Sequence, residues 1–283
     1  MSDSSSSSRP AVIERHYTKG GLTERLLAAL TAAGKDIDRL TPDDLAAVDE
    51  FHSRRRLATE ELADMLAPRP GQTLLDIGSG LGGPSRYLAG VRGCRVSGID
   101  LTTEFVETAT ELSRRAGLAG RVDFRQGSAL DLPFADACFD LVWSQNVAMN
   151  IEDRARMYAE MHRVLKPGGR LAIQDITQGP AGAPHYPVPW ANDPSISFLR
   201  TPEETRALLQ AAGFQVLIWE DKTAAAIVEA DAERARLAAS PQPRPVLGLH
   251  LVMGADFSEK MRNSQRNQKE GRTGIINAAL QRG

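Results

Sequence analysis

Short apolar runs alternate with amphipathic stretches along the chain from residue 72 onward. The runs are bounded by glycine, proline and polar residues, as buried strands are, whereas the longer stretches repeat apolar positions at helical spacing. This alternation predicts a parallel sheet covered by helices on both faces. We therefore expect an α/β fold with a seven-stranded, mostly parallel, doubly wound sheet. The predicted strands are 73–77, 95–99, 122–126, 139–144, 170–175, 215–220 and 246–252, and the predicted helices between them are 83–90, 104–116, 153–165 and 202–212.

Helical patterns also precede the first strand and interrupt the later part of the chain. Three stretches, 22–33, 42–49 with Thr41 as N-cap, and 53–66, predict an N-terminal helical cap over 21–70. Residues 1–20 begin with a run of serines, so we expect a flexible tail there. The remaining domain, 71–283, contains a proline- and aromatic-rich loop at 179–198 and a helical insertion at 224–239. Long loops of this kind are usually functional, and the first is the expected substrate loop.

Composition restricts the classes of partner. The 283 residues carry a formal net charge of −2 and a pI near 6.2, which does not favour nucleic acid or an anionic membrane surface. The basic segment 260–272 lacks aromatic residues and predicts a solvated helix rather than an RNA contact. No apolar run approaches the ~20 residues of a membrane span, and no secretory signal is visible. We expect a cytoplasmic protein with a small-molecule substrate; whether it forms a homodimer stays open.

The segment LLDIGSGLGG, residues 74–83, is the strongest chemical signal in the chain. Its glycines allow a tight strand-to-helix turn that presents backbone amides to a ligand at a helix N-terminus. Gly78, Gly80 and Gly83 fit the dinucleotide pattern G-x-G-x-x-G, which alone is weak evidence. Asp76 would repel a pyrophosphate but suits a cationic amine. This carboxylate therefore favours S-adenosylmethionine, which carries an ammonium and a sulfonium but no phosphate, over NAD.

A second acid follows at the end of the next predicted strand, in CRVSGIDLT. Asp100 lies 22 residues beyond Gly78, where a carboxylate accepts hydrogen bonds from the two ribose hydroxyls of a nucleoside. Ser144, Gln145 and Asn146 end the fourth predicted strand. Since parallel sheets bind ligands at the carboxyl ends of their strands, these side chains should face the same ligand.

The order of LLDIGSGLGG, SGIDLT, FRQGSALDLPF, FDLVWSQNVAMNI and LKPGGRLAIQDI resembles the class I, Rossmann-like S-adenosylmethionine-dependent methyltransferases over about residues 71–252. The similarity is closest to the group that includes sarcosine/dimethylglycine N-methyltransferases and quinone and tocopherol C-methyltransferases. Many relatives have an acid where this chain has Ser128. The resemblance implies that the methionyl part contacts Asp76, Gly78, Ser79 and Gly80, the ribose Asp100 and Leu101, the adenine Ser128 and Ala129, and the region near the sulfonium Gln145.

The acceptor site is expected over the strand ends. Methyl transfer needs alignment and exclusion of water, and it needs a base only if the acceptor arrives protonated. No cluster with metal-ligand spacing accompanies Asp175, so we expect no metal. The candidate catalytic residues are His52, His185 and Asp175, and the candidate substrate-binding residues are Tyr17, Asn146, Tyr186 and Trp190.

The expected function is transfer of a methyl group from S-adenosylmethionine to nitrogen, oxygen or carbon of a small molecule, with S-adenosylhomocysteine as product. Tyr17, His52 and the loop 185–190 are expected to close over the acceptor as a lid. Two alternatives stay open at this point: an NAD-dependent oxidoreductase on a Rossmann fold, and a non-catalytic protein that binds S-adenosylmethionine.

Overall fold

The computed structural model describes residues 9–239 and 245–283. Its centre is a seven-stranded sheet with the order β3-β2-β1-β4-β5-β7-β6. The pairs β1/β2, β1/β4, β2/β3 and β4/β5 are parallel, whereas β7 runs antiparallel to both β5 and β6. The predicted α/β class and mostly parallel sheet are confirmed. The strands are β1 Thr73–Ile77, β2 Arg95–Asp100, β3 Val122–Gln126, β4 Phe139–Gln145, β5 Leu165–Gln178, β6 Phe214–Asp221 and β7 Thr273–Arg282.

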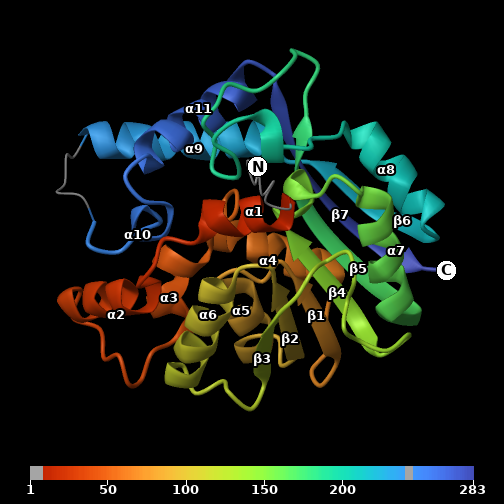
Figure 1. The fold of residues 1–283 in the computed structure, drawn as a ribbon, viewed down its shortest axis with the longest axis horizontal. Helices are drawn as coiled ribbons and strands as arrows, with labels where there is room; N and C mark the ends of the chain where they lie inside the picture. The colour runs from red at the N-terminus through yellow and green to blue at the C-terminus, as the bar shows by residue number, and fades with distance from the viewer. Residues whose placement is uncertain (1–8, 240–244) are drawn as a thin grey trace, which may run out of the picture.

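Helices cover both faces of the sheet because strand side chains alternate in direction. Leu74 of β1 packs in one core cluster with residues of α4 and α5, whereas its neighbour Leu75 packs in another with α7 and α8. Figure 1 shows the resulting layers around the sheet. The α-helices of this part of the chain are α4 Arg55–Leu66, α5 Gly83–Gly90, α6 Thr103–Arg115, α7 Arg154–Val164 and α8 Pro202–Ala211.

The N-terminal cap contains one more helix than the sequence pattern predicts. The expected helices appear as α2 Leu22–Ala32 and α3 Pro42–Asp49, and Thr41 forms the predicted N-cap through a capping box with Asp44. The flexible tail expected over 1–20 is wrong for α1, Arg9–Tyr17, because this helix is fixed by contacts with distant segments, described below, that no local pattern reports. Residues 1–8 lie outside the described part of the chain.

The seventh strand lies elsewhere than predicted. The segment 246–252 does not form a strand; it leads into α10, His250–Met253. A short apolar run alone does not distinguish a strand from a buried helix, which explains the error. The insertion expected at 224–239 is α9, Thr223–Ala239, and it continues through α10 into α11, Phe257–Lys269. These three helices lie above the strand ends in Figure 1.

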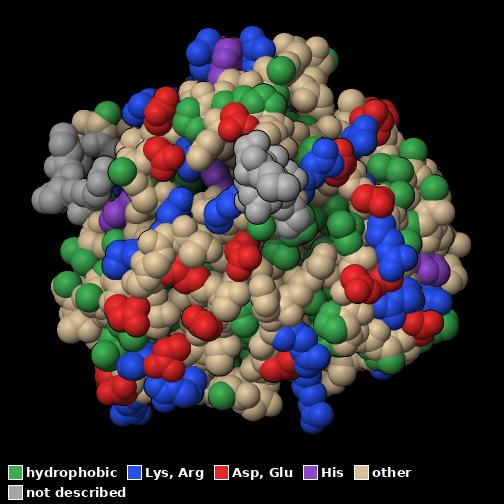
Figure 2. Space-filling model, viewed as in Figure 1, with side chains coloured by type: hydrophobic (Ala, Val, Ile, Leu, Met, Phe, Trp, Pro, Cys, Tyr) green, Lys and Arg blue, Asp and Glu red, His purple; other side chains and the backbone are tan. Residues whose placement is uncertain are grey.

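The segment predicted as a solvated helix is only partly exposed. α11 buries Lys260, Asn267 and Gln268 on the face turned toward the rest of the molecule. On the face seen in Figure 2, basic and acidic side chains are interspersed. In the described ranges, no helix is long and apolar enough to cross a membrane.

Candidate active site

A cavity of about 620 Å³ lies at the carboxyl ends of the parallel strands. Its floor is formed by the turns after β1, β2, β3 and β4. Its walls come from α1, the segment between α3 and α4, the loop before η2 (Pro194–Ile196), and α9 to α11. The volume is in the range of sites that enclose a whole small molecule. The predicted residues that line it are Tyr17, His52, Asp76, Gly78, Ser79, Gly80, Asp100, Leu101, Ser128, Ala129, Gln145, Asn146 and Trp190.

The glycine turn needs glycine at its first position for two reasons. Gly78 has φ of 69°, and a Cβ built there would lie 2.2 Å from Cγ2 of Val147. Gly80 also has positive φ, 51°, and its amide donates a hydrogen bond to Asp100 Oδ2 at 2.8 Å. The turn therefore brings backbone against the floor of the cavity, as the sequence predicts.

Asp76 is a buried carboxylate at the base of this turn. It accepts a hydrogen bond from Ser85 Oγ at 2.5 Å, and it lines the cavity. Burial raises its pKa to about 7, and the nearby charge of Asp100 acts in the same direction against the Ser85 hydrogen bond. Burial therefore makes the ionised form of Asp76 less favourable, and a cation bound beside it would offset that free-energy cost.

Asp100 ends β2 with both oxygens facing donors. Oδ2 accepts from Gly80 and Oδ1 accepts from the Thr102 amide, each at 2.8 Å. Burial raises the pKa of Asp100, although these backbone hydrogen bonds oppose the rise. The Thr102 hydroxyl and the Leu101 amide also lower the pKa of Asp100 through hydrogen bonds, so this carboxylate is surrounded by donors at the cavity floor. Ser128 and Ala129 line the same part of the cavity, but Ser128 Oγ already accepts from the Leu130 amide at 3.1 Å.

The cap reaches the glycine turn through a close backbone contact. A Cβ at Gly83 would lie 2.5 Å from the carbonyl oxygen of Asp49, so only glycine allows the C-terminal end of α3 to pack there. Arg86 of α5 fixes the same end of α3 with an ion pair of 2.7 Å to Asp49 Oδ2, and both side chains are fully buried. The cap is thus joined to the helix that begins at the glycine turn.

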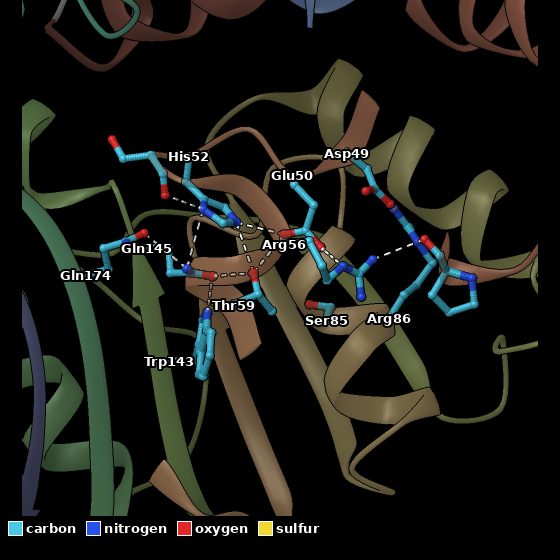
Figure 3. Close-up of polar contacts among 12 residues, drawn as sticks. Asp49, Glu50, His52, Arg56, Thr59, Ser85, Arg86, Trp143, Gln145 and Gln174 are labelled. Atoms are coloured by element: carbon cyan, nitrogen blue, oxygen red, sulfur yellow. Dashed lines mark hydrogen bonds and ion pairs between the residues drawn. The ribbon is translucent and has the colours of Figure 1, made fainter. Parts of the chain in front are cut away.

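His52 extends from this cap segment into a buried polar cluster (Figure 3). Its Nε2 lies 2.8 Å from Glu50 Oε2 and 3.1 Å from Thr59 Oγ1. Thr59 donates to the same Glu50 oxygen at 2.7 Å, and Arg56 pairs with the other oxygen at 2.7 Å. Glu50 has a fully buried side chain, whereas the His52 side chain is 4% exposed and reaches the cavity lining.

Gln145 and Asn146 link the end of β4 to this cluster. Gln145 Oε1 accepts from the Trp143 indole at 2.9 Å, and its Nε2 lies 3.5 Å from His52 Nδ1. Asn146 adopts φ of 53° and donates to Ser53 Oγ at 3.2 Å. Residues other than glycine rarely adopt positive φ, so the contacts around Asn146 must stabilise this backbone conformation beside the cavity.

The lid over the cavity is built from α1 and the loop that follows β5. Tyr17 donates to Asn150 Oδ1 at 2.8 Å, and the Asn150 amide donates to the carbonyls of Trp190 and Ile196 at 2.9 and 2.8 Å. His16 Nε2 lies 3.1 Å from the Pro189 carbonyl. The structure therefore brings together Tyr17, His52 and Trp190, as the lid hypothesis expects.

His185 and Tyr186 do not belong to this lid. The backbone of His185 bonds on both sides to the Asn267 side chain of α11, at 2.8 and 3.0 Å, and its imidazole points to Glu270 at 2.8 Å. Tyr186 packs against the buried cluster that includes Val188. Neither residue lines the cavity, so the structure does not bring them together with the other candidate residues: α11 fixes this end of the loop outside the cavity.

Asp175 is also outside the cavity. It is buried on the opposite face of β5 from Gln174, where the Ala148 amide donates to it at 3.3 Å. Burial raises its pKa to about 6, partly offset by the charge of Arg154. The structure therefore does not place Asp175 with the other candidate residues, because alternation along the strand turns it toward α7.

Several cavity residues have no counterpart in the sequence prediction. Asn150 lines the cavity and accepts from Tyr17, whereas Glu50 lies behind the lining and holds His52; neither stands in a recognisable sequence pattern. The helices α9 to α11 add a further wall that the sequence analysis did not expect. The cavity residues from these helices are Ala226, Glu229, Ala230, Glu233, Leu249, Met253, Met261, Ser264, Gln265 and Gln268.

Comparison with known proteins decides the family. A model described as "Methyltransferase domain" matches residues 75–173. The chain is 30% identical over 196 residues to the sarcosine/dimethylglycine N-methyltransferase of Halorhodospira halochloris, a match that covers 69% of this chain and 70% of that protein. This chain belongs to the S-adenosylmethionine-dependent methyltransferases. The predicted resemblance is confirmed.

Two other known proteins match different shares of the chain. The methyltransferase is 38% identical over 142 residues to the 27-O-demethylrifamycin SV methyltransferase of Amycolatopsis mediterranei, covering 50% of this chain and 51% of that one. It spans about half the length of the first curated relatives it matches. A crystal structure of the [4+2]-cyclase SpnF matches with a TM-score of 0.67 and 25% identity, covering 98% of this chain and 97% of that one.

The residues of this methyltransferase fit S-adenosylmethionine. Asp76 would offer its buried carboxylate to the ammonium group, and the carboxylate of Asp100, which also lines the cavity, would accept from the ribose hydroxyls. The buried Ser79 Oγ has no hydrogen-bond partner. A pyrophosphate at the same turn would meet the carboxylate of Asp76 instead, so the site does not fit NAD.

The affinity for S-adenosylhomocysteine should rise with pH up to about 7. The ammonium group favours ionised Asp76, whose pKa of about 7 in the free protein leaves most of the carboxyl protonated below that pH. At pH 6 we expect about tenfold weaker binding than at pH 8, because with a pKa of about 7 the ionised fraction of Asp76 is about tenfold smaller at pH 6. Titration calorimetry from pH 5.5 to 8.5 measures this. An Asp76→Asn variant should show weak binding without this pH dependence, and a wild-type affinity that is flat with pH would contradict the role of Asp76.

Proposed function

We propose that this protein transfers a methyl group from S-adenosylmethionine to a small molecule held in the same cavity. The observation that carries the proposal is the position of two carboxylates, the buried Asp76 and the partly buried Asp100, at the glycine turn. They open into a space that continues to the lid and to α9. Cofactor and acceptor can therefore meet in one enclosed volume.

The chain's own residues supply binding, orientation and exclusion of water. The bound cofactor supplies a methyl group already activated by its sulfonium. In this proposal the cofactor meets the acceptor beside Gln145 and Gly78, both of which line the cavity. Tyr17 and Trp190 cover that part, and alignment of two reactants in a closed site is a large source of rate enhancement.

A second candidate function follows from the cyclase. Its structure matches nearly the whole chain, so a protein of this architecture need not be a methyltransferase in its reaction. The same cavity could orient a single substrate for a ring closure, with the cofactor held as a structural ligand. This candidate predicts cofactor binding without consumption.

Titration calorimetry and product analysis test the proposal. S-adenosylhomocysteine should bind and NAD should not, because only the former offers a cation to Asp76 without a phosphate. Tight binding of NAD with no response to the adenosyl ligands would overturn the assignment. Binding of S-adenosylmethionine together with conversion of a substrate that gains no methyl group would favour the cyclase candidate.

A further inference from the structure

We propose that the acceptor is a neutral, elongated molecule, and that Gln268 of α11, together with Ser264 one turn before it, hydrogen-bonds a group of the acceptor far from the methylated atom. This inference rests on the proposed methyl transfer. It names a second anchoring point for the acceptor, on the helical wall of the cavity, and the chemical class that this point selects.

Gln268 is a buried amide side chain that lines the cavity and is only 8% exposed. Among the residues that the structure describes, its side chain has no hydrogen-bond partner. Ser264, four positions earlier on the same face of α11, also lines the cavity, and in the same part of the chain its hydroxyl has no partner either. Solvent in the cavity can satisfy both groups in the free protein. A ligand that displaces this solvent must offer a hydrogen-bonding group in its place, because an unpaired buried amide is costly.

The rotation of α11 is fixed by contacts on its neighbouring face. Asn263 and Asn267 donate to backbone carbonyls of the loop that follows β5, at 2.9 and 3.0 Å. Each asparagine directly precedes one of the two cavity residues, Ser264 and Gln268. Since consecutive positions on a helix point in different directions, binding of the asparagines to the loop leaves the next two side chains turned into the cavity.

The position of Gln268 relative to the sheet indicates the length of the acceptor. α11 ends at Lys269 and β7 begins at Thr273, so Gln268 lies at the β7 end of the cavity, where Ile275 also lines it. In the proposed binding mode the cofactor covers the ends of β3, β2 and β1 and reaches Gln145 at the end of β4. β5 is the strand between β4 and β7, so the acceptor has two strand spacings, or ~10 Å, to cross. A molecule that meets both amides is longer than a simple amino acid.

Most other side chains of this part of the cavity are apolar. On α9, the cavity face contains the small residues Ala226 and Ala230, which leave room beneath the helix. An apolar lining with a few polar groups favours a ligand with an apolar body and few polar substituents. The other apolar residues are Ile13, Phe51, Met149, Pro189, Trp190, Leu249, Met253, Met261 and Ile275.

The charged side chains of this part balance one another. Arg54, in a side chain 4% exposed, pairs with Glu61 at 2.7 Å and with Glu229 at 2.6 Å. Arg55, the other arginine of the lining, is exposed. A hydrogen bond from within α9 lowers the pKa of Glu233, and the charge of Arg55 acts in the same direction. Two arginines of the lining thus accompany two carboxylates of α9, with no net charge, which favours a neutral acceptor.

A rigid probe with one polar group at each end tests the anchoring point. Biphenyl-4,4′-diol is about two strand spacings, or ~10 Å, long, and biphenyl-4-ol lacks one of its hydroxyls. With S-adenosylhomocysteine saturating, we expect the diol to bind about fivefold or more tightly than the mono-ol in titration calorimetry, the scale of one hydrogen bond. The anionic analogue 4′-hydroxybiphenyl-4-carboxylate should bind more weakly than the diol. A crystal structure of the diol complex should place one of its oxygens within hydrogen-bond distance of the Gln268 amide.

The variant Gln268→Met keeps the length of the side chain but removes its amide. The advantage of the diol over the mono-ol should fall to about twofold or less, because the second hydroxyl has lost its partner. Ser264→Ala should lower the same advantage in part. Gln210→Met is the matched control and should keep the wild-type difference, because Gln210 is exposed on α8, outside the cavity lining. The affinity for S-adenosylhomocysteine, measured on each variant, checks that the fold is kept.

The contrary results separate the parts of this inference. Equal binding of diol and mono-ol by the wild-type protein would overturn the anchoring point, as would a difference that Gln268→Met leaves intact or an equal loss of affinity for both probes. Tighter binding of the carboxylate than of the diol would overturn the neutral class. If no biphenyl bound to a protein that binds S-adenosylhomocysteine, the whole inference would be wrong while the proposed function stood. Absence of S-adenosylmethionine and S-adenosylhomocysteine binding by the wild-type protein would overturn the proposed function itself.

Discussion

Replacement of Asp100 by alanine should weaken S-adenosylhomocysteine binding by ~1.5–3 kcal/mol, or about 10- to 150-fold. The carboxylate accepts from the Gly80 and Thr102 amides at 2.8 Å, and in the expected binding mode it also accepts from the ribose hydroxyls. Its loss removes charge-assisted hydrogen bonds to the ligand and loosens the glycine turn. Titration calorimetry on the folded variant measures the change.

Asp123→Ala is the matched control for Asp100. Asp123 is an exposed acid on the neighbouring strand β3, where it accepts from Ser97 Oγ at 3.0 Å. It lies outside the cavity lining, so its loss should leave the affinity within about threefold. If the Asp100 variant kept wild-type affinity with an unchanged circular dichroism spectrum, the assigned ribose contact would be refuted.

Replacement of Arg86 by methionine should destabilise the folded protein by about 3–5 kcal/mol. The guanidinium is fully buried and pairs with the equally buried Asp49, and it also donates to Ser113 Oγ at 2.9 Å and to the Leu81 carbonyl. Methionine fills much of the volume but leaves the Asp49 carboxylate without its cation. The midpoint of urea unfolding should fall accordingly.

Two further variants separate this ion pair from a general packing defect. Arg114→Met removes an exposed pair with Glu111 on α6 and should leave the midpoint of urea unfolding close to that of the wild type. Asp49→Asn combined with Arg86→Met should recover part of the loss, since the double variant buries no unpaired charge. Equal losses in the single and double variants would show that Arg86 acts through packing instead.

The cofactor half of the site could be predicted because its chemistry is local in sequence. Asp76, Gly78 and Gly80 lie within five consecutive positions, and a strand that ends in a glycine turn has few ways to enter a helix. Asp100 follows at the end of the adjacent parallel strand, so register brings it to the same edge. For such residues, the hydrophobic pattern that predicts the strand also predicts at which edge of the sheet the strand ends.

The acceptor half could not be predicted because its walls come from segments far apart in the chain. Asn150 joins Tyr17 to Trp190 across 133 and 40 positions, and nothing in the sequence marks it as a link. His185 and His52 looked alike as single histidines, yet Asn267 fixes one outside the cavity whereas Glu50 and Gln145 fix the other inside it. The orientation of each histidine side chain depends on hydrogen-bond partners far away in the chain, which the sequence pattern does not show.

The sequence by itself determined the α/β class, most strand and helix positions, the cofactor turn and its two acids, since hydrophobic periodicity and turn chemistry act between near neighbours. Only the tertiary structure decided that β7 is Thr273–Arg282, that α9 to α11 close over the strand ends, and that His52 rests on Glu50. An amphipathic pattern reports that one face of an element is buried, but not against what. The partner is chosen by packing of the whole chain, and this packing positions the groups that contact the acceptor.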